Sequence, residues 1–239
     1  MRQVRKREQI RHGLDREGDQ EMVTVTAGVG RAGPKIGRYA ALAGMIMAGP
    51  ARLGAVRLVA VDGPAGSGKT TFASRLVAAL RSLPGPPLNV GEVHTDDLLD
   101  GWTEPVAYWP RLESSVLIPL SMGQPGGFHP YDWVAGGFAA ELVEVPVPDV
   151  LVLEGVASCR AQVRSRLTVA VSVVAPHELR LARGIERDGV ELRAEWVRWM
   201  AQEESHFRLD GTVAAADLCI NGSPEVPHDP DEEYVLMTV

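Results

Sequence analysis

The sequence predicts an α/β domain built on a five-stranded, mostly parallel β-sheet with helices on both faces. One observation is that short, nearly continuous apolar runs alternate with stretches whose apolar residues recur every three or four positions. A second is that the first apolar run leads directly into a glycine-rich turn and then into a helical pattern. Because uninterrupted apolar strands are buried on both faces, helices are expected to cover both sides of the sheet.

The apolar runs set the expected order of elements. We expect strands at residues 57–62, 88–93, 150–153, 169–174 and 217–220. Helical patterns are expected at about 36–48, 71–80 and 177–188. Strands that alternate with helices in this way favour parallel pairing.

Charge and apolar content divide the 239 residues into three parts. Residues 1–35 have few apolar and many charged residues, so we expect a disordered extension that cannot offset the entropy cost of folding. We place one folded domain at 36–225 and a C-terminal tail at 226–239.

The overall composition argues against several classes of protein. A net charge of −7 is poorly suited to a nucleic-acid-coating surface. The apolar stretch 39–49 falls short of the roughly twenty residues that span a membrane. Cys159 and Cys219 lie far apart, without metal-ligand spacing, which indicates reduced thiols. We therefore expect an acidic cytoplasmic protein without nucleic-acid or membrane partners, and leave open whether it forms a homo-oligomer.

The glycine-rich turn spells a complete phosphate-binding loop, G-x-x-x-x-G-K-T, from Gly63 to Thr70. Its glycines let successive backbone N–H groups face a polyanion, and the following helix adds a partial positive charge. Lys69 is expected to reach the β- and γ-phosphates of ATP, and the Thr70 hydroxyl to hold Mg²⁺. The residues expected to bind the nucleotide are Gly63, Ala65, Gly66, Ser67, Gly68, Lys69, Thr70 and Thr71.

Acidic residues follow two of the expected strands, at the sheet edge where the phosphates would lie. Glu154 ends the run L-V-L-E and is expected to serve Mg²⁺. Asp96 and Asp97 follow the second strand, and we favour Asp96 as the base that accepts a proton from a substrate hydroxyl. The alternatives are a solvated strand end for Glu154 and a helix cap or solvated turn for the pair.

A helical arginine row is predicted after the fourth strand. Arg180, Arg183 and Arg187 share one face, and we expect Arg183 and Arg187 to close over the polyphosphate as part of a lid at about 177–193. The alternative interpretation pairs them with nearby acidic side chains on an exposed helix.

The segment 101–148 is rich in aromatic residues, glycines and prolines, and it leaves from a strand end. In open α/β sheets ligands bind beyond the carboxyl ends of strands, so this insertion is the expected acceptor-binding region. By contrast, the helical spacing of Trp196, Trp199, Met200 and Phe207 favours a core position over a base-stacking one. The scattered histidines receive no catalytic role.

With these residues in place, the sequence resembles the uridine kinase group of P-loop kinases, which includes phosphoribulokinase-like and pantothenate kinase-like enzymes. The resemblance covers roughly residues 55–222. It rests on V-A-V-D-G-P-A-G-S-G-K-T-T-F-A, H-T-D-D-L-L-D-G-W, P-Y-D-W, V-L-V-L-E-G-V and R-L-A-R-G-I-E-R-D. It implies a P-loop NTPase fold of nucleoside-kinase type, with a five-stranded parallel sheet and an arginine lid.

The same resemblance implies roles for individual residues. It implies that Asp96 is a base that also touches Mg²⁺, that Glu154 helps to hold the metal, and that Arg183 and Arg187 belong to the lid. The acceptor residues that we assign are Asp97, Tyr131, Asp132 and Trp133. Departures from the family pattern fall at Leu98 and Leu99, at residues 134–137, and at Gly184, where a second lid arginine is common.

The sequence therefore favours an ATP- and Mg²⁺-dependent kinase that moves the γ-phosphoryl group to a hydroxyl of a small molecule. A nucleoside is the leading acceptor, and a sugar, a vitamin precursor or another alcohol is the immediate alternative. From another class, the alternative is a regulatory ATPase that binds a protein partner. A binding module that keeps the loop but lacks turnover is the third interpretation.

Overall fold

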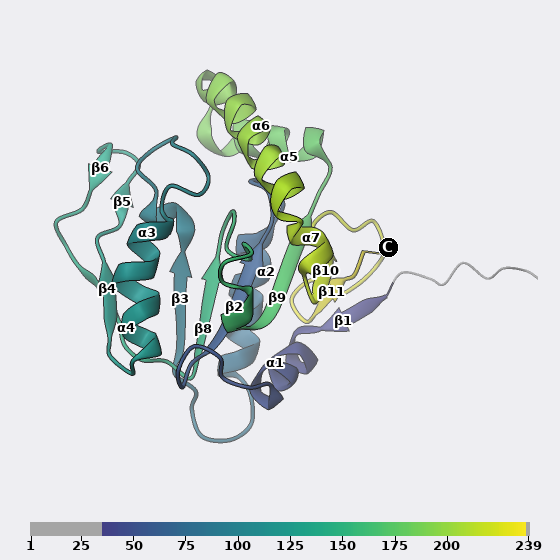
Figure 1. The fold of residues 1–239 in the computed structure, drawn as a ribbon. Coiled ribbons are helices and arrows are strands. Elements are labelled where there is room, and N and C mark those ends of the chain that lie inside the picture. The colour runs from purple at the N-terminus through teal and green to yellow at the C-terminus, as the bar shows by residue number, and fades with distance from the viewer. Residues whose placement is uncertain (1–34, 238–239) are drawn as a thin grey trace, which may run out of the picture. The chain divides into compact units, whose positions relative to one another are not determined.

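Five parallel strands form the central sheet in the order β10-β9-β2-β8-β3 (Figure 1). The computed structural model describes residues 35–237. The strands are β2 (Arg57–Asp62), β3 (Val90–His94), β8 (Val150–Glu154), β9 (Leu167–Val174) and β10 (Leu218–Asn221). All four neighbouring pairs are parallel, and the expected strand ends are displaced by at most two residues. The predicted fold class is confirmed.

Seven α-helices accompany the strands within the described residues. They are α1 (Tyr39–Ala48), α2 (Lys69–Arg81), α3 (Trp109–Leu112), α4 (Ile118–Ser121), α5 (His177–Asp188), α6 (Arg193–Asp210) and α7 (Thr212–Ala215). A π-helical turn, Glu113–Leu117, joins α3 to α4. The helices expected at 71–80 and 177–188 are α2 and α5. The helix expected from about residue 36 is α1, which begins only at Tyr39 because Ile36–Arg38 pair with another strand as β1.

Two hydrophobic cores lie on opposite faces of the sheet, because successive strand residues point to opposite sides. Val59 and Val61 of β2 belong to the core that includes α1 and α2. Leu58 and Ala60 belong to the core that includes α3, α4 and the Trp199 side chain of α6. Helices therefore cover both faces, as the apolar strands predicted.

The insertion runs from the end of β3 to the start of β8 and lies on the β3 side of the sheet, in teal in Figure 1. It begins with a 3-10 turn, Thr95–Leu98, and includes α3 and α4. Its strands form two short antiparallel pairs: β4 (Gly126–Phe128) with β7 (Val143–Val145), and β5 (Tyr131–Asp132) with β6 (Gly137–Phe138).

A second ribbon joins the two ends of the described chain. β1 (Ile36–Arg38) pairs antiparallel with β11 (Glu233–Val235), which lies in the segment set apart above as a tail. The segment is ordered against the domain because the Tyr234 ring packs edge-on against Tyr39 and Phe72. The expectation of disorder for residues 1–35 concerns residues that, apart from Lys35, lie outside the described part of the chain.

Two further expectations concern the membrane and the thiols. Within residues 35–237, every helix is too short or too polar to span a bilayer. Cys159 is buried and Cys219 half-buried, and both are free thiols.

Candidate active site

The phosphate loop connects β2 to α2, and three of its glycines adopt positive φ angles. At Gly63 (φ +147°) an added Cβ would lie 2.1 Å from the Val173 carbonyl oxygen, and at Gly66 (φ +76°) it would lie 2.7 Å from the Arg180 carbonyl oxygen. Only glycine fits such conformations and such close approaches without strain. Gly68 (φ +97°) precedes the first residue of α2.

The loop presents backbone donors as the sequence predicted. Among the described residues, no protein acceptor takes the N–H groups of Gly66 and Gly68. Lys69, Thr70 and Thr71 form the first turn of α2, where N–H groups have no intrahelical partner. A polyphosphate fits this set of donors at the positive end of a helix.

Asp62, at the end of β2, holds the base of the loop in place. Its buried carboxylate accepts N–H bonds from Gly63 at 2.7 Å, and from Ala157 and Cys159 at 2.8 Å. Burial raises the pKa of Asp62 to about 6, although the three N–H bonds oppose the rise. The carboxylate thereby joins the start of the phosphate loop to the turn after β8. Sequence reasoning assigned Asp62 only to the strand.

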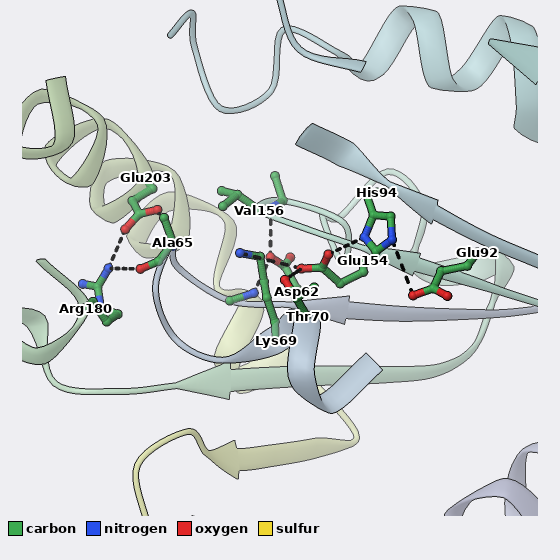
Figure 2. A network of polar contacts seen from close by, with 12 residues as sticks. Asp62, Ala65, Lys69, Thr70, Glu92, His94, Glu154, Val156, Arg180 and Glu203 are labelled. Carbon is green, nitrogen blue, oxygen red and sulfur yellow. Dashed lines mark hydrogen bonds and ion pairs between the residues drawn. The ribbon is translucent and has the colours of Figure 1, made fainter. Parts of the chain in front are cut away.

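A buried ion pair clasps the other side of the loop. Arg180 Nη1 lies 2.6 Å from Glu203 Oε1, and both side chains are buried. Glu203 Oε2 accepts the Ala65 N–H at 2.8 Å, and Arg180 donates to the Ala65 carbonyl at 3.3 Å. Figure 2 shows this clasp beside the loop, separate from the cluster around Glu154. Glu203 lies on α6, far from the loop in sequence, and no sequence signal pointed to it.

Glu154 lies at the centre of a polar cluster at the carboxyl edge of the sheet (Figure 2). Its Oε1 accepts a hydrogen bond from Thr70 Oγ1 at 3.2 Å and lies 3.8 Å from Lys69 Nζ. Its Oε2 lies 2.7 Å from His94 Nδ1. Burial raises the pKa of Glu154, but the His94 hydrogen bond and the Lys69 charge outweigh burial, so the net shift is downward. Glu154 is therefore an ionised carboxylate beside Lys69 and Thr70.

His94 is a site residue that sequence reasoning did not single out. The parallel register places His94 of β3 directly beside Glu154 of β8. Its Nε2 also lies 3.5 Å from Glu92 Oε1, so the ring is held between two carboxylates. The Glu154 hydrogen bond raises the pKa of His94 to about 8, against the opposing effect of burial. Only the register brings this pair together, and a single sequence does not reveal it.

Asp96 and Asp97 lie in the 3-10 turn that follows β3. The turn packs closely against the backbone at Gly155, the residue after Glu154, because glycine lacks a side chain: an added Cβ would lie 1.8 Å from Thr95 Oγ1. The Asp96 side chain is exposed to water, but it lies in a cleft and is therefore surrounded by protein. Desolvation raises the pKa of Asp96, Glu154 adds to the rise, and Lys69 and Arg187 oppose it. Desolvation also raises the pKa of Asp97.

The three arginines of α5 have three different environments. Arg180 belongs to the buried clasp. Arg183 donates to the carbonyls of Gly66 at 3.0 Å and Gly222 at 3.2 Å. Arg187 makes two bonds to Asp188, at 2.7 and 2.9 Å, and remains exposed. Arg180 and Arg183 therefore attach α5 to the phosphate loop, whereas Arg187 has an exposed charge in the cleft.

Gly184 stands where the family often has another arginine, and the structure gives a reason. An added Cβ at this position would lie 2.4 Å from the Trp196 ring. Trp196 is 1% exposed and donates its indole N–H to Asp188 at 3.0 Å. The ring occupies the space that a longer side chain would need.

Two clefts meet at the phosphate loop. One, of about 490 Å³, extends from the loop toward Tyr39, Asn221 and Tyr234. The other, of about 800 Å³, extends toward the insertion and α6. The residues that line both are Ala65, Lys69, Thr70, Asp96, Arg187 and Trp196. Asp97 and Glu154 line the second cleft only.

The second cleft has aromatic walls that come from distant parts of the chain. Trp102 contacts Trp133, Trp196 and Trp199 edge to face, with ring centroids 5.8–5.9 Å apart. Trp196, Trp199 and Met200 are buried, which confirms the predicted core positions. Trp196 and Trp199 nevertheless also face the cleft. Periodicity identified their burial but not this second role.

The predicted acceptor residues of the insertion are placed differently from one another. Tyr131 and Trp133 line the second cleft, with ring centroids 5.2 Å apart. Asp132 is exposed and absent from the lining, and its carboxylate accepts the N–H groups of Val134 and Ala135, both at 2.9 Å. Asp132 therefore holds the turn that carries Trp133.

The oxygen donors of the site suit Mg²⁺. The Thr70 hydroxyl and the Glu154 carboxylate lie 3.2 Å apart, and Asp96 faces the same meeting point of the clefts. Mg²⁺ prefers oxygen ligands and commonly uses one or two protein groups together with phosphates and water. Among the described residues there is no group of three or more His, Cys, Asp or Glu side chains that could hold a metal ion.

Comparison with known proteins identifies solved structures with a similar fold. Neither a protein-family model nor a curated protein sequence matches this chain. A solved structure described as a possible uridine kinase from Bacillus stearothermophilus has a TM-score of 0.56 and 19% identity, covering 76% of this chain and 96% of that one. A candidate fructose transport system kinase from Silicibacter sp. TM1040 has a TM-score of 0.50 and 19% identity, covering 74% and 94%. The YGR205w protein has a TM-score of 0.52 and 12% identity, covering 76% and 90%.

At these identities the comparisons show a shared fold. The chain has the fold of the P-loop kinases, as its resemblance to the uridine kinase group implied.

Proposed function

We propose that the protein is an ATP- and Mg²⁺-dependent kinase that transfers the γ-phosphoryl group to a hydroxyl of a small molecule. The observation that carries the proposal is the meeting of two clefts at Lys69, Thr70, Asp96 and Arg187. A kinase needs two substrates to meet end to end, and a nucleotide-only binding protein has no need of the second cleft.

The nucleotide is assigned to the smaller cleft. The N–H groups of Gly66, Gly68 and the first turn of α2 would bind the phosphates, and Lys69 would bridge the β- and γ-phosphates. Asp62 and Glu203 accept hydrogen bonds from the neighbouring N–H groups of Gly63 and Ala65, which the phosphates do not use. These bonds hold the loop, and with it the phosphate-binding donors, in place before the nucleotide arrives. A preorganised set of donors loses little energy to reorganisation during the reaction.

Mg²⁺ would be held by Thr70 and Glu154, with Asp96 facing the same place. When bound, the ion neutralises charge on the β- and γ-phosphate oxygens. The His94 hydrogen bond orients Glu154 and keeps one of its oxygens occupied, so the other oxygen points toward Thr70 and Lys69.

Asp96 is the proposed base. It lines both clefts, whereas Asp97 lines only the second, so Asp96 alone of the pair faces both substrates. As the acceptor oxygen forms its bond to the γ-phosphorus, the bond from that phosphorus to the β–γ bridging oxygen breaks. The hydroxyl proton passes to the Asp96 carboxylate. Desolvation raises the pKa of Asp96 and so increases its basicity.

The two outer arginines of α5 have separate proposed roles. The exposed guanidinium of Arg187 would neutralise charge that develops on the transferred group. Arg183 would act as a positioning residue, because its donors already hold the loop carbonyl of Gly66 and the carbonyl of Gly222. The lid at 177–193 would thus close mainly through the end of α5 that carries Arg187.

A nucleoside remains the leading acceptor, supported by the fold shared with the possible uridine kinase and by the planar aromatic walls of the second cleft. The alternative is a non-nucleoside alcohol such as a sugar or a vitamin precursor. We also propose a cytoplasmic enzyme that takes a small-molecule acceptor and has no nucleic-acid or membrane partner. The net charge of −7 supports the first of these exclusions.

A substrate screen tests the proposed function. The protein is incubated with ATP, Mg²⁺ and a mixture of hydroxyl-bearing metabolites, and mass spectrometry detects any compound that gains a phosphate. We expect one class of alcohol to be phosphorylated and to stimulate ADP release. The Asp96→Asn variant should lose transfer while still binding an ATP analogue. Slow ATP hydrolysis that no alcohol stimulates would contradict the kinase and favour a regulatory ATPase.

A further inference from the structure

We infer that the acceptor is an alcohol that carries no negative charge and whose body is aromatic or apolar. The inference rests on the proposed function, because it takes the second cleft as the acceptor site. It goes further by naming the acceptor class, and it excludes sugar phosphates and hydroxy acids.

The cationic side chains of the second cleft are already paired with carboxylates of the protein. Three cationic or basic side chains line it, and each is already bonded to a carboxylate. Lys69 lies 3.8 Å from Glu154, His94 lies 2.7 Å from the same carboxylate, and Arg187 makes two bonds to Asp188. Lys69 and Arg187 also line the nucleotide cleft, so the nucleotide phosphates would compete for them. An anionic acceptor therefore finds no uncommitted cation in the cleft lining.

Two carboxylates of the second cleft are free to contact an acceptor. Asp96 and Asp97 face the second cleft, and within residues 35–237 no hydrogen bond or ion pair engages either carboxylate. They can accept hydrogen bonds from a hydroxyl or an amine of the acceptor. A carboxylate or phosphate on the acceptor would be repelled by them and by the bound triphosphate. The cleft therefore selects against negative charge.

Much of the lining of the second cleft is apolar or aromatic. Leu99, Val134, Leu192 and four tryptophans belong to it. At its rim Trp133 is 43% exposed and Val134 is 99% exposed. A planar or apolar group would remove this surface from water and contact the indole rings. A small, fully hydroxylated acceptor would leave it exposed.

The charge selectivity is tested with alcohols matched in size that differ by one anionic group. Suitable pairs are uridine with orotidine and pantothenol with pantothenate, set within larger panels of uncharged aromatic alcohols and of anionic alcohols. Binding is measured by ligand-observed NMR and calorimetry on the full chain with Mg²⁺ and a non-hydrolysable ATP analogue. We expect the uncharged member of a pair to bind at least about tenfold more tightly, a difference of about 1.4 kcal/mol. Tighter binding by anionic members, or no binding in the uncharged panel, would overturn the inference.

Two variants link the selectivity to named side chains. Asp97→Asn should reduce the preference for the uncharged member severalfold, while Glu144→Gln, an exposed acid of the same insertion outside the cleft lining, should leave it unchanged. Trp133→Ala should weaken the binding of uncharged aromatic alcohols about tenfold, within the usual range for loss of one stacking side chain. Leu142→Ala, also exposed in the insertion but outside the lining, is the matched control. Equal effects of variant and control would count against the cleft as the site.

The outcomes separate this inference from the proposed function. If an anionic alcohol is phosphorylated, the kinase proposal stands and the inferred acceptor class is wrong. If uncharged aromatic alcohols bind in the second cleft but receive no phosphate, the inferred binding class stands and the kinase proposal fails.

Discussion

The two clefts of this protein are built in opposite ways. The nucleotide cleft depends on backbone groups of one continuous segment, held by buried carboxylates at Asp62 and Glu203. The acceptor cleft depends on side chains, and its four tryptophans come from the insertion and from α6. A site built from backbone groups depends on one backbone conformation. A site built from side chains can acquire a different ligand when its residues are substituted. The resemblance to known kinases is accordingly strongest in the phosphate loop, and the departures fall in the acceptor half and at Gly184 of the lid.

The buried groups behind the loop also explain why the two halves work as one unit. Arg180 and Glu203 connect α5 and α6 to Ala65, and α6 in turn carries Trp196 and Trp199 into the acceptor cleft. The phosphate loop and the acceptor wall are therefore connected through the helix pair α5 and α6.

The largest effect is expected at Lys69, one of the six residues that line both clefts. Lys69→Ala should lower the rate of phosphoryl transfer about a thousandfold, because a preorganised charge at the transferred group is lost. Initial rates with the acceptor identified by the screen, together with calorimetry of an ATP analogue, measure this. Lys35→Ala, at an exposed lysine, is the control and should be neutral. Unaltered turnover in Lys69→Ala would refute the assignment of the nucleotide cleft.

Breaking the buried clasp should mainly reduce stability. Arg180→Met leaves the Glu203 carboxylate buried without its partner, so we expect the free energy of unfolding to fall by about 3–5 kcal/mol. Urea unfolding measures the change. Arg198→Met breaks a partly exposed pair with Glu195, also on α6, and should cost less than about 1 kcal/mol.

The double variant Arg180→Met with Glu203→Leu sharpens the same test. It removes both charges, so much of the lost stability should return. Affinity for an ATP analogue should nevertheless be lower than in the native protein, because the Ala65 N–H no longer has the acceptor that positions the loop. Full recovery of affinity would show that the clasp serves stability alone.

Asp62 should give the nucleotide half a specific dependence on pH. Its folded-state pKa of about 6 lies above the ordinary aspartate value of 3.8, so the folded protein binds the proton more tightly than the unfolded chain. The associated stabilisation is complete below about pH 4 and is lost as pH rises through about 6, a change of about 3 kcal/mol.

The Asp62→Asn variant isolates that dependence. It replaces one acceptor oxygen by an NH₂ group that faces backbone N–H donors, so it should be less stable than the native protein at every pH. The difference in free energy of unfolding should be largest near pH 4 and shrink toward pH 7. A difference that stays constant across this range would rule out titration of Asp62.

The smallest effect is expected where the lid meets the acceptor wall. Gly184→Ala places a methyl group against the Trp196 ring, so we expect a loss of about 1–3 kcal/mol of stability and weaker acceptor binding. Thermal unfolding and acceptor titration measure the two effects. Gly44→Ala, at an exposed helical glycine with open space around it, should instead stabilise by about 0.5–1 kcal/mol. Acceptor affinity equal to that of the native protein would show that Trp196 does not shape the cleft.

Local sequence was sufficient for the strands, the main helices and the phosphate loop. Apolar runs and glycine positions express short-range constraints, because the strand period and the ability of glycine to adopt the positive φ angles found at Gly63, Gly66 and Gly68 are local properties of the chain. Glu154 and Asp96 could be predicted for a related reason, since the carboxyl ends of parallel strands meet at one edge of a sheet.

Contacts between distant segments were decided only by the tertiary structure. The register of β3 against β8 places His94 beside Glu154, and the packing of α6 places Glu203 against Ala65. The same packing places the buried Trp196 and Trp199 along the acceptor cleft as well as in the core. It also brings Arg180 and Arg183 within hydrogen-bonding distance of the loop. Periodicity determines which face of an element is buried, whereas the partner across that face depends on how whole elements pack, which no local pattern encodes.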